Sequence, residues 1–261
     1  MKKSRVWAWF WVALGTLYFL LPMYGTLEFS LRARKGVYSF DAYGSVLGDP
    51  QFRETFTYSV GLAVATIIVS LLLVVPTAYW VHLRLPRLRP VMEFITLLPF
   101  VVPPIVLVFG LIKIYSAPPL QLVVSPALLV AGYVVLSFPY MYRAVDTGLR
   151  AMDVRALTEA SQSLGASWFT ILFRVIFPNL RVALLGGAFL TFAIVIGEFT
   201  LATMLNWPAF GPYLALIGQN RAYEPAALAI LSFLLTWACV GLISLLSRGG
   251  RGQQGQIGGA R

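Results

Sequence analysis

Two ionisable side chains lie within long apolar runs of the sequence, where a charge is costly. Lys113 and Glu198 are these residues. A charge at the centre of a bilayer costs at least about 2.5 kcal/mol, so each is expected to face protein or water and is a candidate for lining a pathway. Glu198 can hold a cation, pair with a basic residue of a neighbouring subunit, or fix its own helix through Thr191 or Thr200. Lys113 can instead extend its amine to the outer surface.

Other kinds of chemistry lack the residues that they need. The sequence has no Gly-rich phosphate loop of the Walker type, so ATP hydrolysis by that route is not expected. It contains one histidine, His82, and one cysteine, Cys239, which leaves neither a multi-histidine metal site nor a disulfide framework. A serine-histidine hydrolase would need His82, which lies beside Arg84 at the end of an apolar run. The sequence therefore predicts a protein that is not an enzyme and holds no metal or cofactor.

The composition is that of a membrane protein with several spans. Hydrophobic residues make up 59% of the chain and charged residues 11%, whereas soluble domains are usually about one quarter charged. The net charge of +10 would suit nucleic-acid binding in a soluble protein. Here the basic residues lie between apolar runs, as topology signals do. Membrane lipid, and no nucleic acid, is the expected environment.

The predicted fold is all-α, with six transmembrane helices. Each apolar run is long enough to cross about 30 Å of hydrocarbon at 1.5 Å per residue. The first run is too long for a signal peptide and lacks a small-x-small cleavage site. Residues 29–57 are expected to form an external loop with a short interfacial helix. The six runs are Val6–Leu27, Tyr58–Val81, Val91–Tyr115, Leu122–Tyr142, Val182–Leu205 and Pro225–Leu246.

The distribution of basic residues predicts the orientation of these spans. An even number of spans places both termini on one side, and 14 Lys and Arg residues lie on that side against 5 on the other, with Lys113 within a span. This bias predicts a multi-pass protein of a bacterial or archaeal inner membrane with cytoplasmic termini. Residues 1–247 are expected to form one transmembrane domain with a cytoplasmic loop over 144–181. The Gly- and Gln-rich residues 248–261 are expected to be a flexible tail.

Prolines interrupt the third apolar run. Pro99, Pro103 and Pro104 lack the N–H that an α-helix needs, so each is expected to break the hydrogen-bond ladder. Irregular backbone at membrane depth is tolerated where protein or a water-filled cavity satisfies it. Pro103 and Pro104 are therefore candidates for lining a pathway, and a simple packing kink is the alternative.

A polar segment between the fourth and fifth runs predicts a helix, a sharp turn and a second helix. Asp153 is a suitable N-cap, and an apolar face follows at helical spacing. Gly165 can end the first helix with a positive φ angle. Ser167 can cap a second helix, Trp168–Ile176, that Pro178 is expected to end. The residues of the apolar face are Leu157, Ala160, Ser161 and Leu164.

The same segment resembles the EAA loop of binding-protein-dependent ABC importer permeases. In that family the pattern is Glu-Ala-Ala, three residues, Gly, nine residues, Ile, one residue, Leu-Pro. Ser161 stands at the third position, Val175 at that of the isoleucine and Phe177 at that of the leucine. The corresponding residues of this chain are Glu159, Ala160, Ser161, Gly165, Val175, Phe177 and Pro178.

The resemblance implies a permease subunit of a type I ABC importer. Such a subunit pairs with an identical or homologous permease, with two ATP-binding subunits and with a periplasmic or lipoprotein substrate-binding protein. Glu159 would then face basic groups in a cleft of an ATP-binding subunit, while Ala160 and Ser161 give a close surface. Leu164 would belong to the same docking segment, and Gly165 would supply the turn.

A second, shorter resemblance concerns the substrate. The GEFT stretch around Glu198 is similar to the fifth span of permeases for polyamines, iron, thiamine, and sulfate or molybdate. With the following FGPYLALIGQ, it is most similar to the spermidine/putrescine branch. Two other classes of protein remain open: a standalone channel or secondary transporter, and a membrane scaffold that transports nothing.

Overall fold

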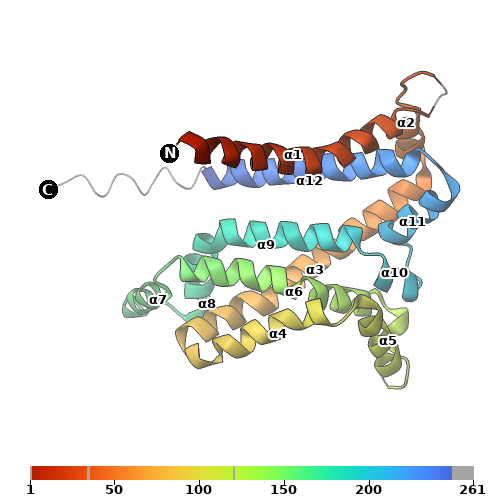
Figure 1. Cartoon of the computed structure of the whole chain (residues 1–261). Helices are drawn as coiled ribbons and strands as arrows, with labels where there is room; N and C mark the ends of the chain where they lie inside the picture. Colours follow the sequence, from red (N-terminus) through yellow and green to blue (C-terminus); the bar gives the residue numbers. More distant parts are fainter. Residues whose placement is uncertain (1, 34–35, 120, 249–261) are drawn as a thin grey trace. The chain divides into compact units, whose positions relative to one another are not determined.

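The computed structural model describes residues 2–33, 36–119 and 121–248, and the regular elements within these ranges are all helical (Figure 1). The α-helices are α1 (Lys2–Ser30), α2 (Asp41–Gly48), α3 (Pro50–Leu83), α4 (Arg89–Val101), α5 (Pro104–Tyr115), α6 (Pro126–Arg150), α7 (Val154–Ser163), α8 (Trp168–Ile171), α9 (Phe177–Gly197), α10 (Thr200–Met204), α11 (Phe210–Asn220) and α12 (Glu224–Arg248). Two 3-10 turns, η1 (Pro86–Leu88) and η2 (Leu122–Val124), and a π-helical turn, η3 (Leu172–Ile176), complete the described elements.

Four stretches of helix in the described residues are long and apolar enough to cross a membrane, and a bent pair raises the number to five. They correspond to the first, second, fourth and fifth apolar runs of the sequence. Within the sixth run, the stretch Glu224–Leu235 of α12 counts as a shorter apolar helix. A short helix, α2, is present between the first two runs, and its interfacial position stays a prediction. Residues 249–261 of the predicted tail lie outside the described residues. The four stretches are Val6–Ser30, Pro50–Leu83, Pro126–Arg150 and Trp168–Gly197.

The third apolar run is broken into α4 and α5, which meet at an angle of 98°. Val102 has an extended backbone at the end of α4, and Pro103 and Pro104 begin α5. Proline is well placed there because the first helical turn needs no N–H donor. The prediction that Pro99 also breaks the helix is wrong, since Pro99 lies inside α4.

The predicted end of the fifth span is also wrong. The helix ends at Gly197 instead of continuing to Leu205, and Glu198 has an extended backbone. The short helix α10 follows this break. Glu198 therefore lies between two helices and not inside one.

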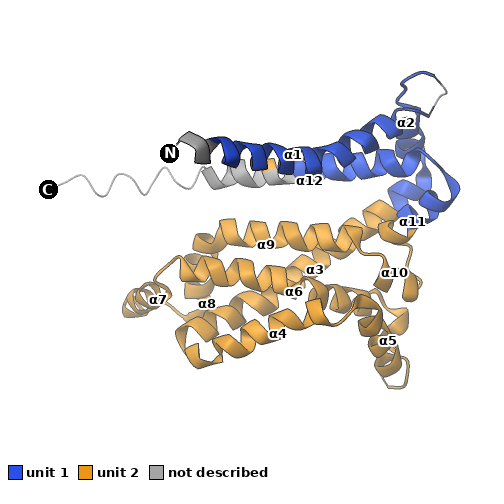
Figure 2. Ribbon diagram, in the orientation of Figure 1, with its two compact units in different colours: residues 1–54, 213–237 blue, residues 55–212, 238–261 orange. Residues whose placement is uncertain are grey.

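The chain divides into two compact units (Figure 2). Unit 1 comprises residues 1–54 and 213–237. Within it, the Asp49 carboxylate accepts a hydrogen bond of 3.2 Å from the Tyr213 hydroxyl and lies 3.7 Å from the Arg221 guanidinium. Burial, with the nearby Asp49 charge, raises the pKa of Tyr213 to about 12. These contacts join the start of α3 to α11 and to the connection before α12.

The described core of unit 2 (residues 55–212) is built around the contact between α6 and α9. A Cβ atom on Gly148 would lie 2.6 Å from the Leu180 side chain and 2.8 Å from the Ala183 Cβ, and one on Gly187 would lie 2.8 Å from the Met141 sulfur. Small residues thus bring the two helices together.

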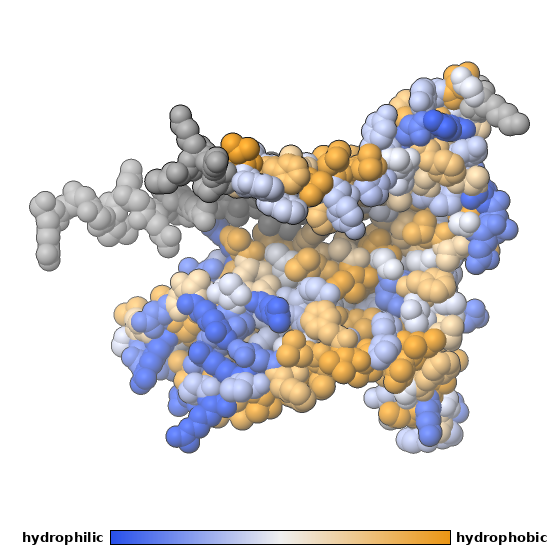
Figure 3. Space-filling view, viewed as in Figure 1, coloured by the Kyte–Doolittle hydropathy of each residue, from blue (hydrophilic) through white to orange (hydrophobic). Residues whose placement is uncertain are grey.

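Gly132 also packs closely, since a Cβ atom there would lie 2.5 Å from the Leu201 side chain. A Cβ atom on Gly186 or on Gly197 would meet no described atom within 4 Å. Hydrophilic side chains gather at the end of unit 2 that carries α7, and hydrophobic side chains cover much of α4 and α5 (Figure 3). The α7 end of unit 2 is therefore its polar end.

Candidate functional site

The segment after α6 folds as a capped helix and a sharp turn, as the sequence predicts. Asp153 accepts a hydrogen bond of 2.9 Å from the Ala156 N–H at the start of α7. Gly165 has a φ angle of 78°, which suits glycine. The Ser167 hydroxyl accepts a hydrogen bond of 3.4 Å from the Thr170 N–H and caps α8. The caps and the turn fix the shape of this segment locally.

The buried face of α7 is offset from its apolar face. Val154 and Thr158 are buried, whereas Leu164 is 87% exposed and Ala160 is also exposed. The inward stripe begins at Val154 and continues through Thr158 to the half-buried Ser161. Ala160 and Leu164 therefore lie on the outer surface with Glu159 and Gly165.

Glu159 is exposed and has a local partner. Its carboxylate lies 2.8 Å from the Arg155 Nε, one turn earlier on α7. The hydrogen bond between the two side chains and the nearby charge of Glu159 raise the pKa of Arg155. The side chains of Glu159 and Arg155 are 62% and 81% exposed, so solvent screens their attraction. Glu159 can consequently exchange this contact for another basic group.

The second helix of the segment is not stopped by Pro178, contrary to the prediction. It passes through the π-helical turn η3 directly into α9, so that helical backbone runs from Trp168 to Gly197. Within the turn, the Phe177 N–H bonds to the Leu172 carbonyl. The wider turn makes room for Pro178, whose ring would clash with the carbonyl four residues earlier in a regular helix. The polar segment and the membrane span are thus one element.

Contacts with the end of α3 hold the polar segment in place. The Tyr79 hydroxyl and the Thr158 Oγ1 lie 3.0 Å apart and are buried. The rings of Trp80 and Trp168 stack with centroids 5.7 Å apart and an angle of 16°. Ile171 adds an apolar contact to the same core, which also contains residues of α6 and α9. The segment is therefore anchored on one side and exposed on the other.

A network of charged side chains links α3, α4 and α6 near this anchor. Asp146 on α6 lies 2.7 Å from the His82 Nε2 and 2.8 Å from the Arg150 Nε. Arg150 also lies 2.8 Å from the Glu93 carboxylate on α4. Arg89 lies 2.8 Å from the His82 Nδ1.

The partners of His82 determine its tautomer. A guanidinium group can only donate hydrogen bonds, so Nδ1 of His82 accepts the bond from Arg89. Nε2 then carries the hydrogen and donates it to Asp146. Sequence reasoning missed this network, because its residues look like ordinary charges at the ends of membrane spans. The spacing of four residues between Asp146 and Arg150 was the only local signal.

Glu198 caps the helix that follows it. Its carboxylate accepts hydrogen bonds of 3.0 Å from the Leu201 N–H and 3.3 Å from the Ala202 N–H, and only 9% of the residue is exposed. These partners are backbone N–H groups, whereas the Thr191 hydroxyl, which was one of the alternatives, has no hydrogen-bond partner among the described residues. The Glu198 carbonyl lies so close to Gly211 that a Cβ there would be 2.2 Å away. Glu198 is thus held tightly on both sides.

The other pathway candidates are on the surface of unit 2. Lys113, Pro103 and Pro104 are exposed residues in and beside α5, which packs against α10. The structure brings α5 and the helix capped by Glu198 together. The residues 159–165 are grouped separately, on α7 and the turn after it.

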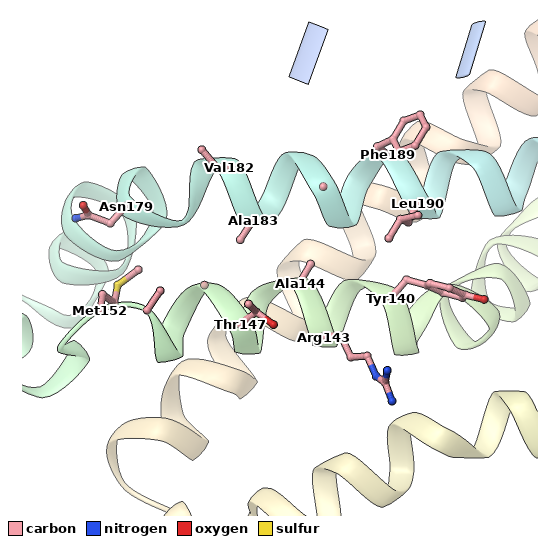
Figure 4. A pocket seen from close by; sticks show the side chains of 13 residues that line it. Tyr140, Arg143, Ala144, Thr147, Met152, Asn179, Val182, Ala183, Phe189 and Leu190 are labelled. Atoms are coloured by element: carbon pink, nitrogen blue, oxygen red, sulfur yellow. The ribbon is translucent and has the colours of Figure 1, made fainter. Parts of the chain in front are cut away.

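A groove of about 820 Å³ runs between α6 and α9 (Figure 4). Tyr140 and Leu190 line it far from α7, and Met152 and Asn179 line it close to α7. Gly148, which packs closely against α9, and Gly186, which has open space beside it, line it as well. The groove therefore follows both helices that flank the polar segment.

Comparison with known proteins identifies the family. Residues 75–248 match the family described as "Binding-protein-dependent transport system inner membrane component". This range is more than half of the chain and includes the polar segment, α9 and the charged network.

Several characterised relatives are transport permeases. The chain is 25% identical over 189 residues to the spermidine/putrescine transport system permease protein PotB of Escherichia coli (strain K12), covering 66% of this chain and 67% of that protein. The match to PotB of Salmonella typhi has the same identity and covers 64% of that protein. A probable molybdenum ABC transporter permease protein of Haloferax volcanii is 30% identical over 200 residues, which are 73% of this chain and 70% of the relative. The chain thus spans about two thirds of the length of these relatives.

Solved structures of ABC transporters share the fold. A chain of a bacterial alginate ABC transporter, in complex with an alginate pentasaccharide-bound periplasmic protein, has a TM-score of 0.66 and 16% identity, covering 94% of this chain and 95% of that chain. A chain of an amino acid ABC transporter has a TM-score of 0.53 and 20% identity, covering 79% and 97%. At these identities the similarity concerns the fold. On the strength of the family match, the chain belongs to the binding-protein-dependent transport system inner membrane components, permease subunits of ABC transporters that lack an ATPase site of their own.

Proposed function

We propose that the chain forms half of a substrate pathway and couples it to ATP hydrolysis through the surface of α7 and the following turn. This coupling surface consists of Glu159, Ala160, Ser161, Leu164 and Gly165. A multi-pass inner-membrane permease without an ATPase site must receive energy from another subunit. The anchored yet exposed α7 is the observation that carries the proposal.

The coupling surface has the chemistry of a docking site. Leu164 is a large apolar side chain that is 87% exposed, and an exposed side chain of this kind gains from burial against a partner. The nearby Glu159 carboxylate can exchange its exposed contact with Arg155 for a basic group of that partner. An apolar contact beside a replaceable charge suits recognition by an ATP-binding subunit.

The connection from this surface to the membrane is short. Movement of α7 reaches α3 through the Tyr79–Thr158 contact and reaches α9 through the continuous helix after Ser167. Both routes are made of packed side chains or helical backbone. Closure of two ATP-binding subunits would therefore move the membrane helices on either side of the groove between α6 and α9.

The wider arrangement that we propose has six spans and both termini in the cytoplasm. The excess of basic residues on the α7 side supports this orientation. The partners are an identical or homologous permease, two ATP-binding subunits and a periplasmic or lipoprotein substrate-binding protein. The similarity in fold to a transporter crystallised with a periplasmic protein is consistent with the last of these.

The proposed substrate is a polyamine or another small polar solute. The PotB relatives are named as permeases for spermidine and putrescine. The buried Glu198 carboxylate supplies negative charge beside α10. Lys113, Pro103 and Pro104 on the adjacent α5 are the other proposed pathway residues. Uptake of labelled spermidine, compared with labelled molybdate, tests this choice.

Purification of the full chain tests the class of transporter. We expect an ATP-binding subunit to co-purify with the tagged chain and uptake in proteoliposomes to require ATP. Proton- or sodium-driven flux by the chain alone would instead assign it to the secondary transporters. The variant Leu164→Asp should lower the yield of the co-purified subunit, while Val37→Asp, at an exposed position outside the proposed spans, should not.

A further inference from the structure

The charged network at the α7 end of unit 2 is unevenly buried. The side chains of His82 and Asp146, which join α3 to α6, are 4% and 13% exposed. The side chains of Arg150 and Glu93, which join α6 to α4, are 51% and 55% exposed. Water can replace an exposed ion pair at little cost, whereas separating a buried pair leaves a polar group unsatisfied. The contact between α6 and α4 is therefore the weaker of the two.

The space between α4 and α6 is also incompletely filled. A cavity of about 350 Å³ lies beside the Arg150–Glu93 pair and is lined by residues of these two helices. The Tyr142 hydroxyl is buried at this cavity and has no hydrogen-bond partner among the described residues. By contrast, Gly148 draws α6 tightly onto α9. The polar cavity thus separates two helices that an exposed ion pair connects at this end.

The weak contact between α4 and α6 matters because of how α4 is connected to the rest of the chain. α4 continues into α5 only through the 98° break at Pro103 and Pro104, so the two helices do not form one rigid rod. α3, in contrast, is tied to α7 by the Tyr79–Thr158 contact and to α6 by the His82–Asp146 hydrogen bond. At the α7 end, α3 is thus joined to α6, and the start of α4 is joined to α3 through the Arg89–His82 hydrogen bond of 2.8 Å. The exposed Glu93–Arg150 pair is the contact between α4 and α6 that can separate.

We propose that Glu93 and Arg150 form a releasable latch between α4 and α6, and that His82 and Asp146 form the permanent joint beside it. The latch rests on the proposed coupling function, because ATP-driven movement of α7 supplies the force that opens it. When the Glu93–Arg150 pair opens, α4 rotates away from α6 between the Arg89–His82 bond at its start and the break before α5, and Arg150 keeps its contact with Asp146. Glu93 and Arg150 are thus positioning residues and not part of the coupling surface.

Distances between spin labels in the assembled complex test the latch. In a Cys239→Ser background, one label pair joins α4 to the end of α6 (Phe94→Cys with Ala151→Cys), and a second joins α3 to the same point (Thr77→Cys with Ala151→Cys). All three positions are exposed. We expect trapping with ATP and vanadate to change the first distance and leave the second unchanged. No change in the first distance, or equal changes in both, would overturn the proposal.

A third label separates this proposal from the coupling function. A label at Ser163 on α7, paired with a label on the ATP-binding subunit, reports whether α7 responds to nucleotide. Movement at Ser163 without a change between α4 and α6 rejects the latch alone. The absence of any nucleotide response at Ser163 rejects the coupling function, and the latch with it.

Two neutral variants provide the matched comparison. Glu93→Gln removes only the exposed pair, so Tm should fall by less than about 4 °C, while the nucleotide-free distance between α4 and α6 shifts toward the trapped one. Asp146→Asn removes the charge shared by His82 and Arg150, so it should lower Tm more strongly. A larger Tm loss in Glu93→Gln than in Asp146→Asn, or no distance shift in Glu93→Gln, would contradict the division into latch and joint.

Discussion

The Tyr79 hydroxyl lies 3.0 Å from the Thr158 Oγ1 in a buried contact that joins α3 to α7. Thr158 also donates a hydrogen bond of 2.6 Å to the Val154 carbonyl, so its single hydroxyl hydrogen is used within α7. The Tyr79 hydroxyl is therefore the donor in the contact between the helices. A side chain from a membrane helix thus holds the inner face of α7 while Glu159 remains exposed on the outer face.

Removal of this hydroxyl should loosen α7 without unfolding it. In Tyr79→Phe, Thr158 keeps its bond to Val154, and the loss should be about 1 kcal/mol. Hydrogen exchange of the amides in residues 154–163 should become faster, because α7 opens more often. Tyr18→Phe, at an exposed position on α1, is the control. Equal exchange in the two variants would show that the contact does not hold α7.

The turn after α7 should depend on the glycine at position 165. Because its φ angle is 78°, Gly165→Ala should cost about 1–2 kcal/mol. The variant should enter the membrane normally, but less ATP-binding subunit should co-purify with it, because the turn positions the coupling surface. Gly61→Ala, on a helix with open space around it, serves as the comparison. Full recovery with Gly165→Ala would mean that the turn geometry is unimportant for assembly.

Two glycines along the groove should respond differently to the same substitution. Gly148→Ala places a methyl group 2.8 Å from the Ala183 Cβ, so α6 and α9 must separate, at a cost of about 1–3 kcal/mol. Gly186→Ala meets no described atom within 4 Å and should gain up to about 1 kcal/mol from helix propensity. Thermal unfolding of the purified chain measures both. A lower Tm for Gly186→Ala than for Gly148→Ala would contradict the packing described here.

Substitutions at Glu198 can separate its role as a helix cap from the effect of its negative charge. Glu198→Gln keeps an oxygen that accepts the bonds from Leu201 and Ala202, but removes the negative charge. If the charge attracts a cationic substrate, uptake of labelled spermidine should fall with little change in Tm. Glu198→Ala should lower Tm as well, by an amount equivalent to about 0.5–2 kcal/mol, because the cap is lost. Normal uptake with Glu198→Gln would assign Glu198 to structure alone.

Much of the polar segment was predictable because local chemistry determines it. Asp153, Gly165 and Ser167 act within a few residues of their positions in the sequence, and each has the predicted role. The inward face of α7 could not be identified locally, because burial depends on contacts with α3, which come from residues far away in the sequence. The burial of Thr158, for example, depends on its partner Tyr79.

The misjudged boundaries have a common physical cause. At Pro178 a π-helical turn accommodates a residue that has no N–H donor, and at Pro99 the α-helix continues without interruption. Rules for single residues overestimate how strongly proline ends a helix when packing favours continuation. The end of the fifth span at Gly197 was missed because Glu198 was interpreted as a charge within the span and not as the cap of a following helix. The close approach of Gly211 comes from farther along the chain.

ATP hydrolysis by the assembled complex, stimulated by its substrate-binding protein, tests the coupling surface most directly. Glu159→Lys and Arg155→Gln should be compared, because both break the ion pair within α7 but only the first removes the negative charge. We predict that Glu159→Lys inserts normally and loses most of the stimulated activity, whereas Arg155→Gln retains it. Unchanged stimulation and transport in Glu159→Lys would contradict the assignment of α7 as the coupling element.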